Sequence, residues 1–113
     1  FIESYHLALN VIKKNKDLLK LKKNYQLIDK NAFDNNAFSD LRSRYDLIFL
    51  DPPYKEKNIE KLMLSIFRSN LIKKNGLIII HRHKKSKDKL PKEFEIVEEK
   101  LYGVSKIIFL KLR

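Results

Sequence analysis

The tetrapeptide Asp51-Pro52-Pro53-Tyr54 places a carboxylate, two rigid residues and an aromatic ring directly after an apolar run. Proline fixes φ at about −65° and has no backbone N–H, so Pro52 can aim its carbonyl beside the carboxylate and Pro53 donates nothing there. These two acceptors can hold both N–H groups of a nucleobase amine and favour a more tetrahedral nitrogen. Tyr54 offers a flat face to an unstacked base, worth about 1–3 kcal/mol. The alternative is a simple proline turn.

Other polar side chains follow the remaining apolar segments. Glu3 comes after the first segment, Asp29 and Asn31 after the second, and His81 and His83 after the one that begins at residue 77. In an open α/β sheet, ligands bind beyond the carboxyl ends of the strands. Acids also collect at strand ends because they avoid the core, which is the alternative explanation for any one of them. Together these residues predict a site.

Apolar periodicity predicts the elements that must position these side chains. Helical spacing covers residues 5–15, extending toward residue 19, and residues 58–70, with Asn58 as N-cap. Residues 31–43 read as a loop with one helical turn, and Asn75-Gly76 reads as a turn. Strands are expected at residues 1–3, 25–29, 45–50 and 77–81, and on both sides of Gly103.

The two continuous apolar runs, residues 45–50 and 77–81, are typical of strands buried on both faces. The alternation of strands and helices predicts one α/β domain over residues 1–113, with a mainly parallel sheet covered by helices on both faces. The last two strands would form an antiparallel hairpin. We find no internal repeat and no linker.

The composition favours a polyanionic partner. The net charge is +11, from 25 Lys and Arg against 14 Asp and Glu, and lysines near phosphates release counterions on binding. An AT-rich genome would produce the same lysine-rich mix without such a partner. Cysteine is absent and no apolar run reaches the roughly 20 residues of a membrane span, so we expect a cytoplasmic protein without membrane contact.

A basic segment, residues 82–92, follows the run at 77–81. Arg82, Lys84, Lys85 and Lys87 could grip RNA phosphates beside the predicted site. A solvated loop in a lysine-rich protein would look the same.

At the tetrapeptide the sequence resembles class I S-adenosylmethionine-dependent methyltransferases of exocyclic amino groups, which carry Asp/Asn-Pro-Pro-Tyr/Phe after their fourth strand. Almost the whole chain is similar to the 16S ribosomal RNA guanine-N2 methyltransferases (RsmD-like). The segments that carry this resemblance are FIESYHLALNVIKKN, DKNAF, YDLIFLDPPYKEKNIEKLMLSI, LIKKNGLIIIHRH and LYGVSKIIFLKLR.

The resemblance implies a Rossmann-like methyltransferase sheet and S-adenosylmethionine as cofactor. Glu3 would bind the ribose hydroxyls, Asn31 and Ala32 would lie against the adenine, and Asp51 would border the cofactor. The tetrapeptide would hold the amino group and stack on the guanine. The implied partner is ribosomal RNA or the small ribosomal subunit, and we expect a monomer. No metal is implied, since displacement at a sulfonium methyl needs positioning above all.

The chain departs from this family at three points. Residues before Phe1 would have to supply the family's first strand and glycine-rich loop, so we expect an amino-terminally truncated chain that binds the cofactor poorly alone. Tyr5 stands where family members often have Asp, and His81 stands where they usually have Glu. We expect a structural role for His81.

Two alternatives remain open from sequence. Another amino-methyltransferase, acting on adenine N6 in DNA or RNA, shares the tetrapeptide, although the DNA enzymes usually add a recognition domain. Enzymes acting on protein glutamine favour Asn at the position of Asp51. A non-catalytic RNA-binding remnant is favoured by the missing loop, Tyr5 and His81.

Overall fold

The computed structural model describes residues 1–113, which form two compact units, Phe1–Ala37 and Phe38–Arg113. Each unit has its own sheet, and no strand pairing joins the two sheets. The expected single domain stays a prediction. None of the helices is long and apolar enough to cross a bilayer.

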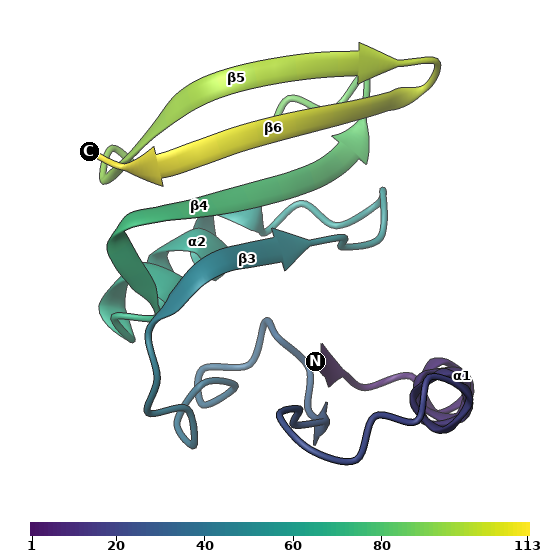
Figure 1. The fold of residues 1–113 in the computed structure, drawn as a ribbon. Helices are drawn as coiled ribbons and strands as arrows, with labels where there is room; N and C mark the ends of the chain where they lie inside the picture. Colours follow the sequence, from purple (N-terminus) through teal and green to yellow (C-terminus); the bar gives the residue numbers. More distant parts are fainter. The chain divides into compact units, whose positions relative to one another are not determined.

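The first unit contains a short parallel pair and one helix. Strand β1 (Ile2–Glu3) pairs with β2 (Ile28–Asp29), and helix α1 (His6–Leu18) connects them (Figure 1). The helix confirms the predicted periodicity, but β2 covers only the last two residues of the predicted strand at 25–29. The register pairs Glu3 with Asp29, so both acids end their strands at the same edge.

The first unit also has a groove of about 480 Å³, lined by residues that include Phe1, Lys16 and Leu27. Phe1 and Leu27 precede the two strands, so this groove lies at their amino ends and not at the edge of the predicted site. Hydrogen bonding to Tyr25, and then to Asp17, raises the pKa of Lys16 beside it.

The second unit is a four-stranded sheet in the order β3-β4-β6-β5. Strands β3 and β4 run parallel, and β6 pairs antiparallel with β4 and β5, as Figure 1 shows. The elements are β3 (Tyr45–Leu50), α2 (Ile59–Arg68), β4 (Ile72–His83), β5 (Phe94–Tyr102) and β6 (Ser105–Leu112). The predicted strand-helix-strand-hairpin order is confirmed here, but the sheet is mixed instead of mainly parallel because the parallel strands fall into two separate sheets.

Helix α2 packs its apolar stripe on one face of this sheet and forms the core. Leu71, Ile72 and Phe94 add to this core, but most of its buried apolar side chains come from α2 and from alternate positions of β4 and β6: Ile59, Leu62, Met63, Ile66, Ile78, Ile80, Ile108 and Leu110. This alternation follows from the two-residue period of a strand. The core of this unit therefore lies between α2 and the α2-facing side chains of β4 and β6.

The opposite face of the sheet departs from the prediction for residues 45–50 and 77–81. Leu47 is 55% exposed and Phe49 is 60% exposed, and the partners Leu77 and Ile79 are only half-buried. Helices on both faces were expected, but within this unit α2 is the one helix and covers one face. The continuous apolar runs therefore predicted these strands correctly, and within this unit only one face of each strand is covered.

Asn75-Gly76 is not a turn but lies inside β4. Gly76 is buried, and a Cβ there would lie 2.5 Å from Cδ1 of Ile72, beside an irregular register with β3. Because the Ile72 side chain lies so close, only glycine fits at this position. The predicted turn at Gly103 is confirmed, with φ of 58° between β5 and β6. Residues 31–43 contain turns without a regular helix.

Candidate functional site

The parallel register of β3 and β4 brings the tetrapeptide beside the end of β4. Leu50 is paired with Ile80, both on the face toward α2. Because side chains alternate along a strand, the next residues, Asp51 and His81, point to the opposite face as neighbours. His81 and His83 are the last residues on that face of β4, so the strand extends two residues beyond the predicted end at residue 81.

Asp51 and His81 are joined by a hydrogen bond of 2.9 Å between Oδ1 and Nδ1. On the other side of the ring, His81 Nε2 lies 2.9 Å from Oγ of Ser105 and 3.3 Å from the hydroxyl of Tyr54. The Asp51 side chain is 58% exposed and that of His81 only 23%. In this cluster the Asp51 carboxylate faces solvent, and the imidazole that binds it is in turn contacted by the hydroxyl groups of Ser105 and Tyr54.

Tyr54 lies against the two histidines through ring edges. Its ring centroid is 5.7 Å from that of His81 and 5.6 Å from that of His83, with steep interplanar angles of 83° and 70°. The residue is 46% exposed. Edge contacts hold the ring while leaving surface for another planar group to stack on.

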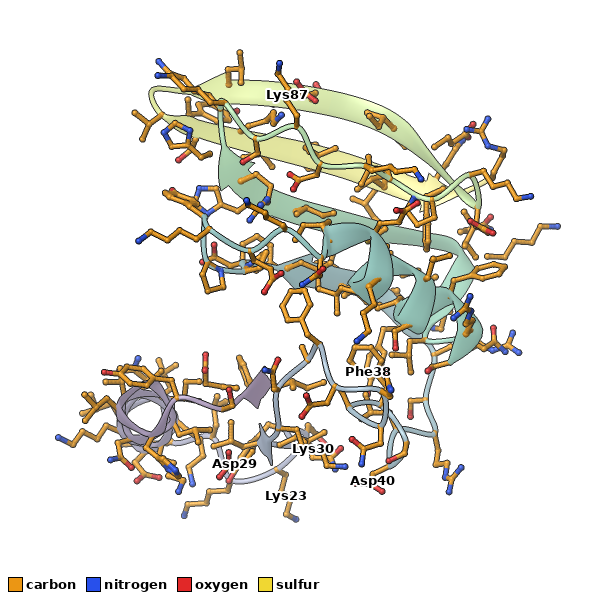
Figure 2. All side chains as sticks on the ribbon, turned by 180° about the vertical axis from the view of Figure 1, so that it is seen from behind. Lys23, Asp29, Lys30, Phe38, Asp40 and Lys87 are labelled. Atoms are coloured by element: carbon orange, nitrogen blue, oxygen red, sulfur yellow. The ribbon has the colours of Figure 1, made fainter.

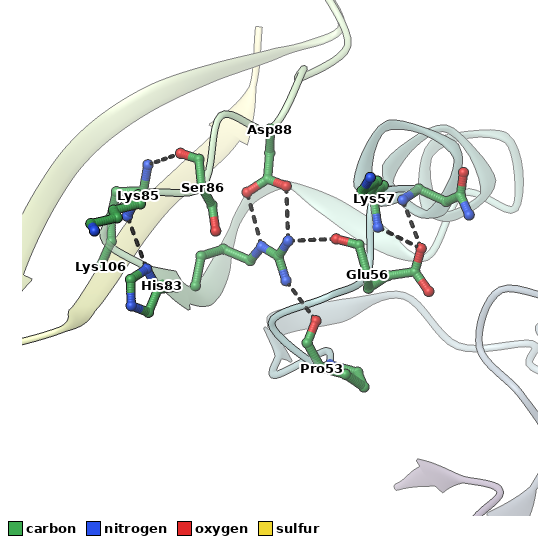
Figure 3. A network of polar contacts seen from close by, with 10 residues as sticks. Pro53, Glu56, Lys57, His83, Lys85, Ser86, Asp88 and Lys106 are labelled. Atoms are coloured by element: carbon green, nitrogen blue, oxygen red, sulfur yellow. Dashed lines mark hydrogen bonds and ion pairs between the residues drawn. The ribbon is translucent and has the colours of Figure 1, made fainter.

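Arg82 is buried on the same side of β4 as Ile78 and Ile80, and it anchors the tetrapeptide loop. Figure 3 shows the loop residues Pro53 and Glu56 together with Asp88 in this network. Its guanidinium donates to both carboxylate oxygens of Asp88 at 2.9 and 3.0 Å, to the Pro53 carbonyl at 3.0 Å and to the Glu56 carbonyl at 2.6 Å. The Glu56 carboxylate accepts from the backbone N–H groups of residues 57 and 58, at 2.8 and 2.7 Å. The loop after β3 is therefore rigid at several points.

This environment does not fit the RNA contact that the sequence suggested for Arg82. The residue is 2% exposed, and its donors are engaged with Asp88 and two backbone carbonyls. A buried arginine whose three guanidinium nitrogens all donate hydrogen bonds within the protein is a structural anchor. Sequence reasoning missed this because a basic run gives no sign of which member lies on the buried face of a strand.

Lys84, Lys85 and Lys87 are exposed on an ordered loop that follows β4. The loop is fixed by hydrogen bonds from the Lys84 N–H to the Val104 carbonyl at 2.8 Å and from Lys106 Nζ to the Ser86 carbonyl at 2.7 Å. Figure 2 labels Lys87 on the outside of this unit. These three lysines can meet phosphates without the loop folding first.

In the first unit, the polar residues expected at the cofactor share one edge. Glu3 ends β1, and its Oε1 accepts from the N–H groups of residues 4 and 5 at 2.9 and 2.8 Å. Asp29, labelled in Figure 2, ends β2, and Asn31 and Ala32 follow it. Asn31 Oδ1 accepts from the Phe33 N–H at 3.0 Å and fixes the turn. The carboxyl ends of this parallel pair thus carry an oriented carboxylate and a structured turn.

The hydrogen bond between His81 and Asp51 was not expected from the sequence, which assigned His81 a structural role. A signal was available, since both residues directly follow paired apolar runs of parallel strands. Using it would have required the register of β3 and β4, which depends on the irregularity between Tyr45 and Leu47.

The family described as "Conserved hypothetical protein 95" matches residues 1–111. The Haemophilus influenzae ribosomal RNA small subunit methyltransferase D is 26% identical over 105 residues, which are 92% of this chain and 54% of the relative. Its similarity therefore extends through both units.

Two solved structures share the fold over 99% of this chain. A conserved hypothetical protein of Streptococcus pyogenes has a TM-score of 0.85 at 28% identity, with 69% of that chain covered. A Haemophilus influenzae protein named as a methylase has a TM-score of 0.81 at 24% identity, with 70% covered. The shared fold is an α/β methyltransferase fold with a mixed sheet.

The chain spans 54% of the Haemophilus influenzae methyltransferase and 62% of a Bacillus subtilis relative, so it matches about half to two thirds of such proteins. Over that length, the family match leaves only the last two residues uncovered. The chain therefore belongs to the family described as conserved hypothetical protein 95, the RsmD-like ribosomal RNA methyltransferases.

Proposed function

We propose that this protein transfers a methyl group from S-adenosylmethionine to the exocyclic N2 amino group of a guanine in 16S ribosomal RNA. The observation that carries the proposal is the tetrapeptide at the end of β3, with an exposed carboxylate and ring on a loop fixed by Arg82. Family membership supports the reaction class.

Asp51 and Pro52 would hold the target amino group. The nitrogen of an aromatic amine is a poor nucleophile because its lone pair is delocalised into the ring. A carboxylate oxygen that accepts one N–H and the Pro52 carbonyl that accepts the other would aim the remaining lone pair at the methyl group. Because Arg82 and Glu56 immobilise the loop, little order has to be gained at the moment of reaction.

Tyr54 would receive the guanine once it leaves its stack. The ring is held by edge contacts with His81 and His83, so a base can stack without first ordering the side chain. Pro53 contributes through its carbonyl bond to Arg82 rather than by touching substrate.

The residues of the first unit fit the cofactor's chemistry. When bound, S-adenosylmethionine supplies an electrophilic methyl group on a sulfonium. Glu3, oriented by two backbone N–H groups at the end of β1, would accept hydrogen bonds from the ribose hydroxyls. Asn31 and Ala32 would border the adenine, and Asp51 would also border the cofactor. Lys84, Lys85 and Lys87 would bind RNA phosphates.

The proposal is tested with the complete translation product of the gene. We expect transfer of labelled methyl to a guanine of unmodified 16S ribosomal RNA or of the small ribosomal subunit. Asp51→Ala should reduce transfer at least about a hundredfold, since it removes an acceptor used in the transition state, while RNA affinity stays within about twofold.

Three results would contradict this proposal. Methylation of adenine would point to another amino-methyltransferase. Binding of RNA without any transfer would point to a non-catalytic RNA-binding protein. Activity that survives Asp51→Ala would show that the site is assigned to the wrong residues.

A further inference from the structure

We propose that His81 is a positioning residue for Asp51, which fixes one oxygen of the carboxylate and leaves the other for the target amino group. This inference rests on the proposed function. It is carried by the bond of 2.9 Å between His81 Nδ1 and Asp51 Oδ1 and by the difference in exposure between the two side chains, 23% and 58%.

The partners of the ring determine its tautomer. A carboxylate only accepts hydrogen bonds, so Nδ1 carries the proton of the bond to Asp51. In the neutral ring Nε2 is then an acceptor, and the hydroxyl of Ser105 donates to it at 2.9 Å, with the hydroxyl of Tyr54 farther away at 3.3 Å. Three side chains from two segments, Asp51 and Tyr54 of the tetrapeptide and Ser105 of β6, thus hold the imidazole so that its N–H points at the carboxylate.

This arrangement holds the Asp51 side chain in one rotamer. An exposed aspartate without such a partner samples several rotamers, and each productive encounter would have to select one of them. With Oδ1 engaged, Oδ2 is the oxygen that can accept the N–H of a bound amine. Preorganised acceptors contribute to the rate because they do not reorient during the reaction.

Aspartate, histidine and serine also form the catalytic relays of acyl-transfer enzymes, but there the aspartate is the buried residue, whereas here it is the exposed one. In such relays the aspartate is the buried orienter and the serine faces substrate. Here Asp51 is the exposed member, while Ser105 lies in a part-buried bond at the start of β6. The geometry therefore favours His81 acting toward Asp51 over activation of Ser105.

Two substitutions separate the two ring nitrogens. The amide nitrogen of Asn lies close to the position of Nδ1, so His81→Asn can keep the donor to Asp51. In His81→Gln the amide reaches the position of Nε2 and that donor is lost. We expect kcat for RNA methylation to fall about tenfold in His81→Gln with KM for RNA unchanged, and to stay within about threefold in His81→Asn.

Three further measurements distinguish positioning from general stability. His6→Gln, the same change at an exposed position of α1, should leave kcat unchanged. In an Asp51→Asn background, His81→Gln should cause little further loss, because the partner it orients is gone. In ¹⁵N-histidine NMR spectra, His81 should show a protonated Nδ1 and an unprotonated Nε2, and Asp51→Ala should shift these signals.

The outcomes separate this inference from the proposed function. If wild type methylates guanine and Asp51→Ala does not, but His81→Gln matches wild type or falls equally with His81→Asn, His81 does not position Asp51. An unprotonated Nδ1 would overturn the inference in the same way. If the wild-type protein transfers no methyl group to RNA, the proposed function fails, and the inference fails with it.

Discussion

Tyr54 combines two groups with separate tasks on the loop after β3. Its ring is 46% exposed and is held edge-on by His81 and His83. Its hydroxyl lies 3.3 Å from His81 Nε2, farther than the hydroxyl of Ser105 at 2.9 Å. At the residue scale, the flat ring should matter more than the hydroxyl, because Ser105 already satisfies Nε2.

This difference predicts the behaviour of two substitutions. Tyr54→Phe keeps the flat face and should change KM for RNA by no more than about twofold. Tyr54→Ala removes a stacking contact worth about 1–3 kcal/mol and should raise KM about tenfold or more. Steady-state methylation of unmodified 16S ribosomal RNA measures both. Equal losses in the two variants would assign the contribution to the hydroxyl.

At the scale of elements, the end of β4 forms hydrogen bonds to the loop after β3 on both faces of the sheet. His81 reaches Asp51 on the face away from α2, and Arg82 reaches Pro53 and Glu56 on the face toward it. Adjacent residues of one strand can do this because their side chains alternate. The end of β4 is thus both a structural support and a part of the candidate site.

The Arg82 anchor predicts a large effect on stability. Arg82→Met leaves Asp88, whose side chain is 7% exposed, without its partner, and two backbone carbonyls lose a donor. Breaking a buried pair in this way costs about 3–5 kcal/mol of the free energy of unfolding. Urea denaturation measures it, and Arg82→Met combined with Asp88→Leu should recover part of the loss.

A surface ion pair serves as the control for this prediction. Lys111 and Glu95 lie 3.1 Å apart with side chains 53% and 37% exposed. Lys111→Met should cost no more than about 1 kcal/mol, because water screens the pair. If Arg82→Met is as mild as this control, then the buried network does not stabilise the loop.

At the scale of the whole molecule, positive charge is spread over both units. The chain carries a net charge of +11, with exposed lysines in the first unit as well as on the loop after β4 (Figure 2). General charge draws RNA toward the protein, whereas a docking surface neutralises particular phosphates. The salt dependence of binding tells the two contributions apart.

Replacing the loop lysines should reduce the salt dependence of RNA binding. Each neutralised phosphate contributes a slope of about −0.7 in log K against log salt for single-stranded RNA, so three lost contacts should flatten it by about 2. The test variant changes Lys84, Lys85 and Lys87 to Ala. The control changes Lys14, Lys22 and Lys23, which are exposed in the first unit.

Both triple variants lower the net charge equally, so a difference between their slopes reports contacts rather than total charge. We expect the control to keep a slope close to that of wild type. If the two variants flatten the slope equally, then the loop after β4 is not a docking surface.

The sequence was sufficient for the local order of the chain. Helix periodicity at residues 59–68, the hairpin turn at Gly103 and the strand before Asp51 depend on neighbouring residues, and all three were predicted. The tetrapeptide could be recognised in the same way, because its rigidity and chemistry are contained in four consecutive residues. The family resemblance was confirmed by a match over residues 1–111.

Tertiary structure decided what depends on pairing between distant residues. The register of β3 against β4 places His81 on Asp51, and the packing of α2 decides that Arg82 is buried while Leu47 is exposed. A basic or apolar run in sequence does not say which face a neighbouring element covers. The sequence by itself therefore determined the reactive groups and their element order, and only the fold decided which side chains support them, because strand register and face coverage arise from long-range packing.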